Sequence, residues 1–360
     1  MRKERALSLL VCAALLLTAM AKTWTAAADN APAGLSDAVS PYPEEYADTD
    51  NARTQAQAVF AESSSGTAMT DGAGYIVWRV EVPETGLYNL EITYRPDTAS
   101  AGDIQRDLLI DGALPFKQAS GLVFSRVFRD TADVFEQDAN RNDIRPQQQE
   151  VDEWITCRVR DAKEAVAQPL LFRLTAGAHE LRLESLKGSM EIQSVKLVPP
   201  EAPPDYADYS AQSADGPDVD IQRFEGEHPS TKSSFTIQAF ADRSPSTQPQ
   251  DPVKIRYNAI GGSKWMYAGQ WLEWSFEVEE SGWYVIAPRY KQTAYSGGYV
   301  SRRLILDGKV PFAQAEAIRF NYADRWTVQP LGGDSGAYRF YLEKGKTHTL
   351  RLQVTLGDMA

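Results

Sequence analysis

Short runs of alternating apolar and polar residues recur along most of the chain. In the run WLEWSFEV (residues 271–278), Leu272, Trp274, Phe276 and Val278 alternate with Trp271, Glu273, Ser275 and Glu277. This period of two places successive side chains on opposite faces of a β-strand. The other runs are YIVWRVEV, LYNLEITY, RDLLID, LLFRLT, HELRLES and EIQSVKLV before residue 199, and WYVIAPRY, SRRLILD, AYRFYLE and HTLRLQVTL after it. Gly, Pro and Asp separate the runs, which predicts an all-β chain of the sandwich type.

The two halves of the chain repeat one another. LLIDGALPF (108–116) returns as LILDGKVPF (304–312), 196 positions later, and residues 75–124 match residues 271–320 at 18 of 50 positions without a gap. The block at His179 returns at His348 with an offset of 169, so the first copy carries about 27 extra residues within 128–153. We therefore predict two homologous sandwiches. Asp-Gly in the repeated phrase predicts a type I′ hairpin, and the following Pro-Phe predicts an edge strand.

The first residues are typical of a secretory leader. A basic segment, Met1–Arg5, precedes an apolar run of 16 residues from Ala6 to Ala21, which is shorter than the ~20 residues of a spanning helix. A membrane anchor is the alternative. We expect a signal peptide (1–28), a tether (29–58), a first module (59–198), a Pro-rich linker (199–220) and a second module (221–360). The mature chain is then secreted or at the cell surface, without a membrane span.

Charge and cysteine content exclude several functions. Residues 1–28 hold four basic side chains and one acidic one, so their removal moves the formal net charge from −12 to −15. Nucleic acid is an unsuitable partner for so acidic a protein. Cys157 is the one cysteine after residue 28, and three scattered His residues do not form a zinc site.

The second half resembles carbohydrate-binding modules of the galactose-binding-like type. The resemblance rests on the run that begins at Trp271, the basic strand after it and the Leu-Asp-Gly hairpin. It implies calcium-containing jelly-roll sandwiches. Phe224-Glu225-Gly226-Glu227 is similar to the paired-Glu motif that opens such modules, so the resemblance implies a structural calcium on Glu225, Glu227 and Asp358. The first copy departs from the motif, with Phe60-Ala61-Glu62 in its place.

A second resemblance covers most of the mature chain. The motifs are Gln137–Pro146, Asp251–Arg256, Gly261-Gly262, Gln270–Trp274, Ser301–Arg303, Asp307–Phe312, Asp324–Trp326 and Val354–Asp358. They resemble the front portion of large extracellular solute-binding proteins of sugar ABC transporters from Paenibacillus-like bacteria. Those proteins place two sandwiches ahead of a two-lobed solute-binding domain. A permease partner would require that domain, which these residues do not contain.

Aromatic residues are dense in the loops of the second copy. Sugar rings stack on flat apolar faces, and planar polar groups bind their hydroxyls. We therefore take as candidate carbohydrate-binding residues Trp265, Tyr267, Trp271, Tyr295, Tyr299, Tyr322 and Trp326. The alternative is that they are core or rim aromatics.

Three other motifs suggest chemistry and are weaker. Asp138–Asp143 has oxygen ligands at alternate positions, but Asp143 and Gln149 stand where an EF-hand requires Gly and Glu, so an Asx-rich turn is the alternative. Gly333–Gly336 copies a serine-protease phrase without a matching His context. Glu273 is the nearest candidate for glycoside hydrolysis and lacks a paired carboxylate.

We expect a non-enzymatic protein that binds polysaccharide or oligosaccharide. Two alternatives remain open. The modules could be structural or protein-interaction units packed on a missing solute-binding domain, or they could accompany a missing glycan-active catalytic domain.

Overall fold

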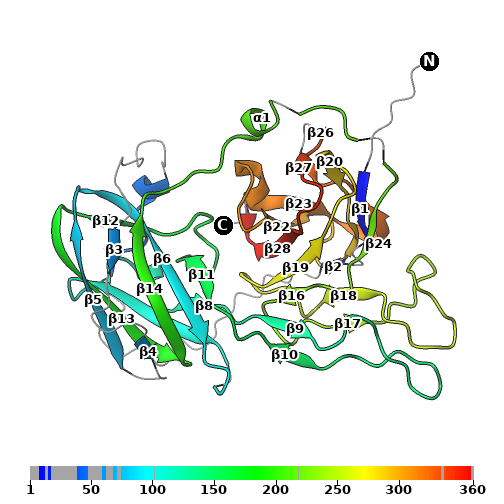
Figure 1. The fold of residues 1–360 in the computed structure, drawn as a ribbon, viewed down its shortest axis with the longest axis horizontal. Coiled ribbons are helices and arrows are strands. Elements are labelled where there is room, and N and C mark those ends of the chain that lie inside the picture. The colour runs from blue at the N-terminus through cyan, green and yellow to red at the C-terminus, as the bar shows by residue number, and fades with distance from the viewer. Residues whose placement is uncertain are drawn as a thin grey trace. The chain divides into compact units, whose positions relative to one another are not determined.

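A computed structural model describes residues 8–12, 15–17, 39–47, 59–61, 68–70, 74–100, 102–211, 213–217, 219–333 and 336–357. The chain divides into two compact units (Figure 1). The first module contains the described residues of 22–126 and 150–202. The second module contains residues 203–360 where described, the segment 127–149 and two short strands near the N-terminus.

The first module is a sandwich of two antiparallel sheets. Its strands are β3 (Val59–Ala61), β4 (Ala68–Thr70), β5 (Tyr75–Val82), β6 (Gly86–Pro96), β7 (Ile104–Ile110), β8 (Leu122–Phe124), β11 (Ile155–Arg158), β12 (Leu171–Leu174), β13 (Gly177–Lys187) and β14 (Met190–Val198), with 3-10 turns η2 (Glu44–Ala47) and η3 (Lys117–Ala119). One sheet has the order β11-β6-β14-β3, with β12 on β6 and β4 on β14, and the other has the order β5-β13-β7-β8. Trp78, Tyr88 and Leu181 lie in the core between them.

The second module repeats this arrangement. Its elements are β1 (Ser8–Cys12), β2 (Leu15–Leu17), β9 (Phe128–Asp130), β10 (Gln148–Glu150), α1 (Tyr206–Tyr209), β15 (Arg223–Glu225), β16 (Thr231–Lys232), β17 (Ala239–Phe240), β18 (Ala259–Gly262), β19 (Trp271–Phe276), β20 (Gly282–Ile286), β21 (Arg289–Gln292), β22 (Tyr299–Leu306), η4 (Ala313–Ala317), β23 (Ile318–Asn321), β24 (Ala323–Val328), β25 (Gly332–Gly333), β26 (Gly336–Ala337), β27 (Arg339–Leu342) and β28 (His348–Thr355). The order β19-β28-β22-β23 matches β5-β13-β7-β8 strand for strand. The predicted all-β sandwich fold is confirmed.

The repeated Asp-Gly phrase forms the same tight turn in both modules. Asp111 and Gly112 have φ of 51° and 82°, and Asp307 and Gly308 have φ of 50° and 77°, as a type I′ turn requires. The edge strand expected directly after the turn was wrong. Pro-Phe leads instead into η3 and η4, each phenylalanine is buried, and the edge strands β8 and β23 follow these turns.

The extra residues of the first copy pack on the second module. β9 lies beside β16, with Phe128 opposite Lys232, and so extends the β19 sheet to the order β10-β9-β16-β19-β28-β22-β23. The buried Lys232 ammonium lies 2.5 Å from a carboxylate oxygen of Asp130. The insertion, which we assigned to the first module at 59–198, thus joins the second compact unit.

Each module also uses a tyrosine from a segment that the sequence pattern assigned to a tether or linker. The Tyr42 hydroxyl accepts a hydrogen bond from Leu171 N, and the Tyr206 hydroxyl accepts one from Arg339 N at the equivalent strand. The two rings contact Phe116 and Phe312, respectively. Residues 203–211 therefore pack on the second module.

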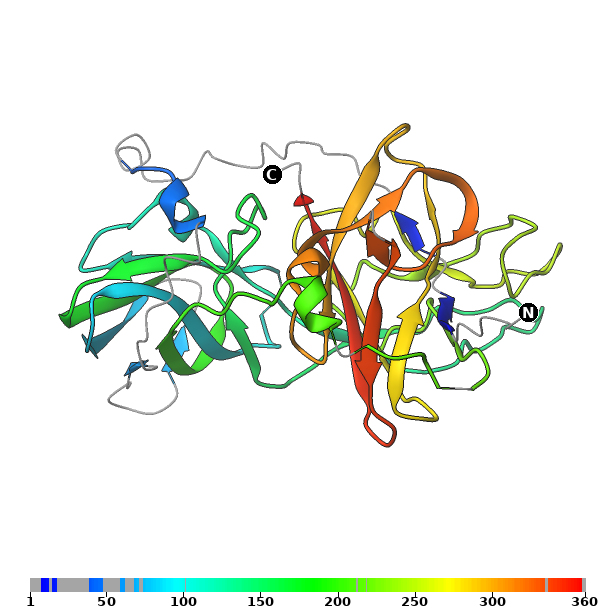
Figure 2. The same cartoon turned by 90° about the horizontal axis from the view of Figure 1, so that it is seen from above.

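β1 and β2 lie inside the predicted signal peptide. Both pair in parallel with strands of the second module: β1 with β15 and β20, and β2 with β18 and β21. The two short blue strands lie within this module in both views (Figures 1 and 2). No helix in the described part of the chain is long and apolar enough to cross a membrane.

Candidate functional site

Three exposed or half-exposed tyrosines lie on segments of the second module that are hydrogen-bonded to one another. Tyr295 lies in the β21–β22 loop, Tyr299 begins β22, and Tyr322 lies between β23 and β24. Tyr322 N donates a 2.9 Å hydrogen bond to Gly298 O, and Gly298 N donates one of 3.3 Å to Tyr295 O. Tyr299 is the cross-strand partner of Asn321. We name Tyr295, Tyr299 and Tyr322 the tyrosine surface.

Three further contacts hold the tyrosine surface in place. The Tyr295 ring lies directly against Gly298, because a Cβ on that glycine would be 1.9 Å from ring carbons. The Arg319 guanidinium lies over the Tyr299 ring, 4.8 Å from its centre. Beneath the loop, the buried Gln292 side chain accepts a hydrogen bond from Tyr295 N. The three rings and the Arg319 cation thus lie on neighbouring segments, residues 295–299 and 319–322, joined by backbone hydrogen bonds and strand pairing.

The first module lacks these tyrosines. Ala99 and Asp103 stand at the positions of Tyr295 and Tyr299 in the repeat alignment. The equivalent loop is instead closed by Arg126, which bonds to Gly102 O at 2.6 Å and to a Glu150 carboxylate oxygen at 2.6 Å. The tyrosine surface is thus a feature of the second copy.

The other aromatic candidates lie elsewhere. Trp265 is fully buried, and its Nε1 donates to Gln270 O at 3.2 Å while Arg302 lies over its ring. Trp271 is also buried, although its alternation predicted an outward position, because the Arg351 guanidinium covers its ring at 3.8 Å. The exposed Tyr267 lies in the 263–270 loop.

Trp326 and its counterpart differ between the copies. Trp326 is buried against Phe240 and Ala259, and its Nε1 donates to an Asp242 carboxylate oxygen at 3.0 Å. The matching strand position in the first module is Trp154, which is 38% exposed and lies under the Arg95 guanidinium at 5.0 Å. Trp154 was missed from the sequence because it lies in the region of the insertion, where the repeat alignment is interrupted.

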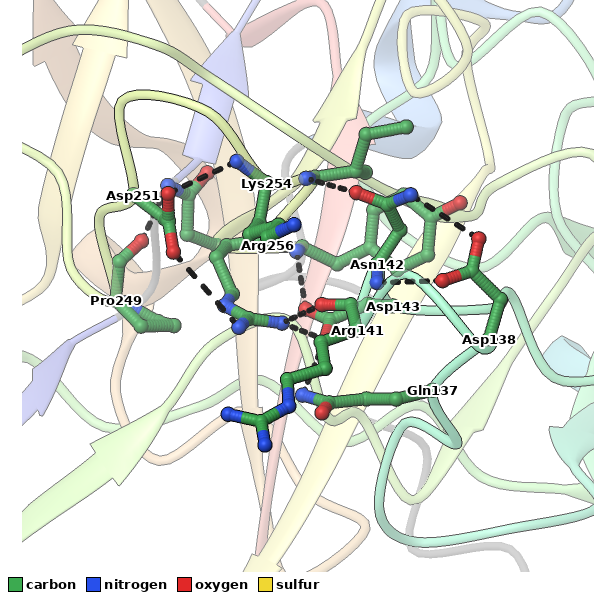
Figure 3. A network of polar contacts seen from close by, with 12 residues as sticks. Gln137, Asp138, Arg141, Asn142, Asp143, Pro249, Asp251, Lys254 and Arg256 are labelled. Carbon is green, nitrogen blue, oxygen red and sulfur yellow. Dashed lines mark hydrogen bonds and ion pairs between the residues drawn. The ribbon is translucent and has the colours of Figure 1, made fainter.

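The insertion and a loop of the second module form the polar network of Figure 3. Arg256 Nη1 donates to Asp143 Oδ1 at 2.7 Å and to Arg141 O at 2.8 Å. Tyr257 N donates to Asp143 Oδ2 at 2.9 Å, and Ile255 N donates to the Asn142 side-chain oxygen at 2.9 Å. The network fastens the insertion to residues 255–257.

The same geometry decides the nature of the Asp138–Asp143 loop. Asp138 accepts hydrogen bonds from Asn142 N at 2.8 Å and the Asn142 side chain at 3.0 Å, and a further one from Asn140 N at 2.8 Å. Together they hold the pKa of this carboxyl below its usual range. The oxygens that would bind calcium are engaged by the chain itself, as in an Asx turn. Glu273 is likewise held, by Arg351 Nε at 2.9 Å and by the Thr231 hydroxyl at 3.1 Å.

The paired glutamates lie at the start of the second module. Glu227 is buried, and burial raises its pKa to about 8, with a further increase from nearby Glu225. Burial also raises the pKa of Glu225, against the lowering effect of Arg223 and Arg289. Asp358 lies outside the described residues, as do Asp334 and Ser335 of the protease-like phrase. Within the described residues, no cluster of three or more His, Cys, Asp or Glu could hold a metal ion.

No protein-family profile and no curated protein matches the chain significantly. Among solved structures it is similar to a β-glucosidase from Paenibacillus barengoltzii (16% identity, TM-score 0.21, 51% of this chain and 13% of that one). It is also similar to a family 35 carbohydrate-binding module from Clostridium thermocellum (13% identity, TM-score 0.22, 39% of this chain and 86% of that one). A third similar structure is the CBM22-1-CBM22-2 tandem domain of Paenibacillus barcinonensis Xyn10C (8% identity, TM-score 0.19, 83% of this chain and 90% of that one). The chain thus spans about an eighth of the β-glucosidase.

Proposed function

We propose that this is a secreted, non-catalytic carbohydrate-binding protein whose second module binds polysaccharide or oligosaccharide through the tyrosine surface. The observation that supports the proposal is the meeting of Tyr295, Tyr299 and Tyr322 around Gly298. Groups of exposed apolar rings mark interaction sites, and pyranose C–H faces are suitable partners for such rings. Arg319 and the backbone of the 295–299 loop supply hydrogen-bond donors for sugar hydroxyls.

Affinity gel electrophoresis across a panel of plant and bacterial polysaccharides tests this proposal. We expect at least one polysaccharide to retard the protein, and Tyr295→Ala or Tyr322→Ala to weaken retardation about tenfold or more, as the loss of a stacked ring of ~1.5 kcal/mol implies. The matched control is Tyr341→Ala, because Tyr341 is similarly exposed but lies on β27. Retardation that Tyr341→Ala weakens as much as Tyr322→Ala would contradict the assignment of the surface.

The calcium ion implied by the family resemblance is a separate proposal. Glu225 and Glu227 would be its carboxylate ligands, since a buried carboxyl with a raised pKa beside a second carboxyl is favoured in its charged form by a cation. The ion would stabilise the start of the second module and would not participate in catalysis.

The transporter role is the finer form of the same proposal. In that role the two modules would be the accessory front of a sugar-uptake solute-binding protein, and a permease would be reached through its two-lobed domain. Two experiments test this role: copurification of the intact extracellular complex, and an assay of radiolabelled oligosaccharide uptake. Uptake that is unchanged when residues 29–360 are deleted would contradict it.

A further inference from the structure

β11, β6 and β14 of the first module lie side by side in one sheet (Figure 1). Their register places three side chains in one row across the sheet. Trp154, just before β11, is beside Arg95 of β6, and Arg95 is opposite Glu191 of β14. Tyr94 and Ile192, which are the next residues of β6 and β14, are buried in the core. Because side chains alternate along a strand, the row that contains Trp154 is on the outward face.

A row of hydroxyl groups follows on the same face. Thr156 of β11 is opposite Thr93 of β6, and Thr93 is opposite Ser194 of β14. The two threonine hydroxyl oxygens are 2.9 Å apart and share a hydrogen bond. A hydroxyl group can donate one hydrogen bond and accept two, so this pair can still bond to hydroxyl groups of a ligand.

Trp154 provides a flat apolar surface beside these polar groups. It is 38% exposed, which is the largest value for a tryptophan in the described part of the chain. The Arg95 guanidinium lies over its ring at 5.0 Å, and Glu191 Oε2 accepts a 3.1 Å hydrogen bond from Arg95 Nε. The ring and the guanidinium are thus held in place before a ligand arrives, which lowers the entropy cost of binding.

The charges of this face are paired with one another. Arg95 forms an ion pair with Glu191. In the next row along the strands, Glu91 lies 3.7 Å from Arg158 and 3.8 Å from Lys196. A charged ligand would have to separate one of these pairs, whereas neutral hydroxyl groups can use the hydrogen-bonding capacity that the pairs leave. Charge complementarity therefore favours a neutral ligand.

The equivalent position of the second module is closed. Trp326, the counterpart of Trp154, is buried against Phe240 and Ala259, and its Nε1 donates to an Asp242 carboxylate oxygen. The sandwich can thus bury a tryptophan at this position. The exposure of Trp154 is therefore not a requirement of the fold, and an exposed ring among ordered polar groups is typical of a ligand site.

We propose that a second carbohydrate site, the Trp154 face, lies on the first module and binds a neutral pyranose polymer. The site is formed by Trp154, Arg95, Glu191, Thr93 and Thr156. The indole ring stacks on the C–H face of one sugar, while the guanidinium and the hydroxyl row bond to sugar hydroxyl groups. The ligand class rests on the proposed function, whereas the site is in the other module, so either can fail without the other.

Affinity gels of the full chain with Tyr295→Ala and Tyr322→Ala test this face without the tyrosine surface. We expect hydroxyethylcellulose, glucomannan or xyloglucan to retard this double variant, and polygalacturonate to leave it unretarded. Adding Trp154→Ala should weaken the retardation about tenfold or more. The matched control adds Tyr75→Ala instead, because Tyr75 is an exposed ring of the same module that lies under Arg182 at 3.8 Å, but on the other sheet.

Each outcome of these gels decides between the two sites. A double variant that no neutral polymer retards, while the wild type is retarded, would overturn the Trp154 face and leave the tyrosine surface standing. Retardation that is lost in Trp154→Ala alone and unchanged in the double variant would support the Trp154 face and refute the tyrosine surface. Equal weakening by Tyr75→Ala and Trp154→Ala, or stronger retardation by polygalacturonate than by the neutral polymers, would overturn the proposal.

Fluorescence quenching keeps the test decisive if Trp154→Ala folds poorly. Because Trp154 is well exposed, acrylamide should quench part of the wild-type tryptophan fluorescence, and oligosaccharides cut from the retarding polymer should reduce this quenching. In Trp154→Phe, which keeps an aromatic ring at the site, the same oligosaccharides should leave the quenching unchanged. Absence of protection in the wild type, or equal protection in Trp154→Phe, would overturn the proposal.

Discussion

The phenol ring of Tyr295 occupies the space where a side chain of Gly298 would lie. A Cβ built on Gly298 would be 1.9 Å from Cδ1 and Cε1 of that ring, far inside van der Waals contact. The glycine therefore determines how the tyrosine is presented to solvent. Because Gly298 O also accepts the hydrogen bond from Tyr322 N, one residue sets the positions of two of the three tyrosines.

We predict that Gly298→Ala weakens polysaccharide binding about as much as Tyr295→Ala does. The new methyl group must displace the Tyr295 ring, whereas the loop is on the surface and the melting temperature should change by no more than about 2 °C. Affinity gels and thermal unfolding measure the two effects. Ser296→Ala is the control in the same loop, and binding by Gly298→Ala at the wild-type level would show that the Tyr295 orientation is irrelevant.

The sheet architecture could be read from the sequence, whereas the fate of individual aromatic residues could not. Trp274 and Trp78 repeat on the inward face of an alternating strand, and both are buried as this pattern indicates. Trp271 is on the opposite face and is also buried, because Arg351 from the neighbouring strand covers it. A cover supplied by a residue 80 positions away leaves no local signal in the sequence.

Long-range packing also explains the elements that sequence reasoning missed. The insertion has little apolar alternation, and polar contacts such as Asp143 with Arg256 hold it to the second module. Tyr42 and Tyr206 lie in Pro-rich segments that lack strand periodicity, yet each caps a sandwich through one ring and one hydroxyl. Periodicity detects regular strands, and it does not detect single anchoring residues.

The buried pair of Asp130 and Lys232 provides a stability prediction. Burial lowers the pKa of Lys232, against the raising effect of Asp130, and the lysine side chain is 1% exposed. Asp130→Ala should cost about 3 kcal/mol in the free energy of unfolding, because it leaves a buried cation without its partner. Urea denaturation followed by tryptophan fluorescence measures this.

The control for that pair is an exposed one. Asp103 lies 3.4 Å from Lys187, and both side chains are more than half exposed. Asp103→Ala should cost less than about 1 kcal/mol. If the two variants lose the same stability, the contact between the insertion and β16 contributes no more than a surface ion pair.

The hairpin aspartate of the second module predicts a pH dependence. Burial raises the pKa of Asp307, but hydrogen bonds from Lys346, Thr349 N and His348 outweigh it and hold the pKa below 3.8. A lowered carboxyl pKa adds stability above pH 3.8 that is lost as the pH falls toward the folded-state pKa. Asp307→Asn should therefore lower the free energy of unfolding by about 1 kcal/mol at pH 6 and by less at pH 3. This figure allows for the partial exposure of Asp307 to solvent.

The first module contains the equivalent aspartate–histidine pair, Asp111 and His179, and here the pKa of the histidine is shifted as well. Burial lowers the pKa of His179, but hydrogen bonds from its ring to Asp111 and Thr175 outweigh it, so the net pKa is raised above 6.5. The stability that the charged His179 ring adds is fully present below pH 6.5 and is lost as the pH rises through the folded-state pKa. His179→Gln should flatten the stability profile above pH 6.5, and urea titrations from pH 5 to 9 measure it. A profile for this variant that falls as steeply as the wild type above pH 6.5 would contradict the assignment.

Glu227 tests the calcium proposal because its pKa is raised above the usual value, whereas the pKa of Asp307 is lowered. With a folded-state pKa of about 8 against 4.5, the folded protein binds a proton that the unfolded chain has released, so stability should fall by a few kcal/mol between pH 4.5 and 8. Calcium favours the charged carboxylate, so it should raise the melting temperature at pH 8 and have little effect at pH 4.5. Glu227→Gln should abolish both the pH-dependent fall and the calcium response, whereas Glu84→Gln, in the first module, should retain both. A calcium response that survives in Glu227→Gln would place the ion elsewhere, and no response in the wild type at pH 8 would refute the site.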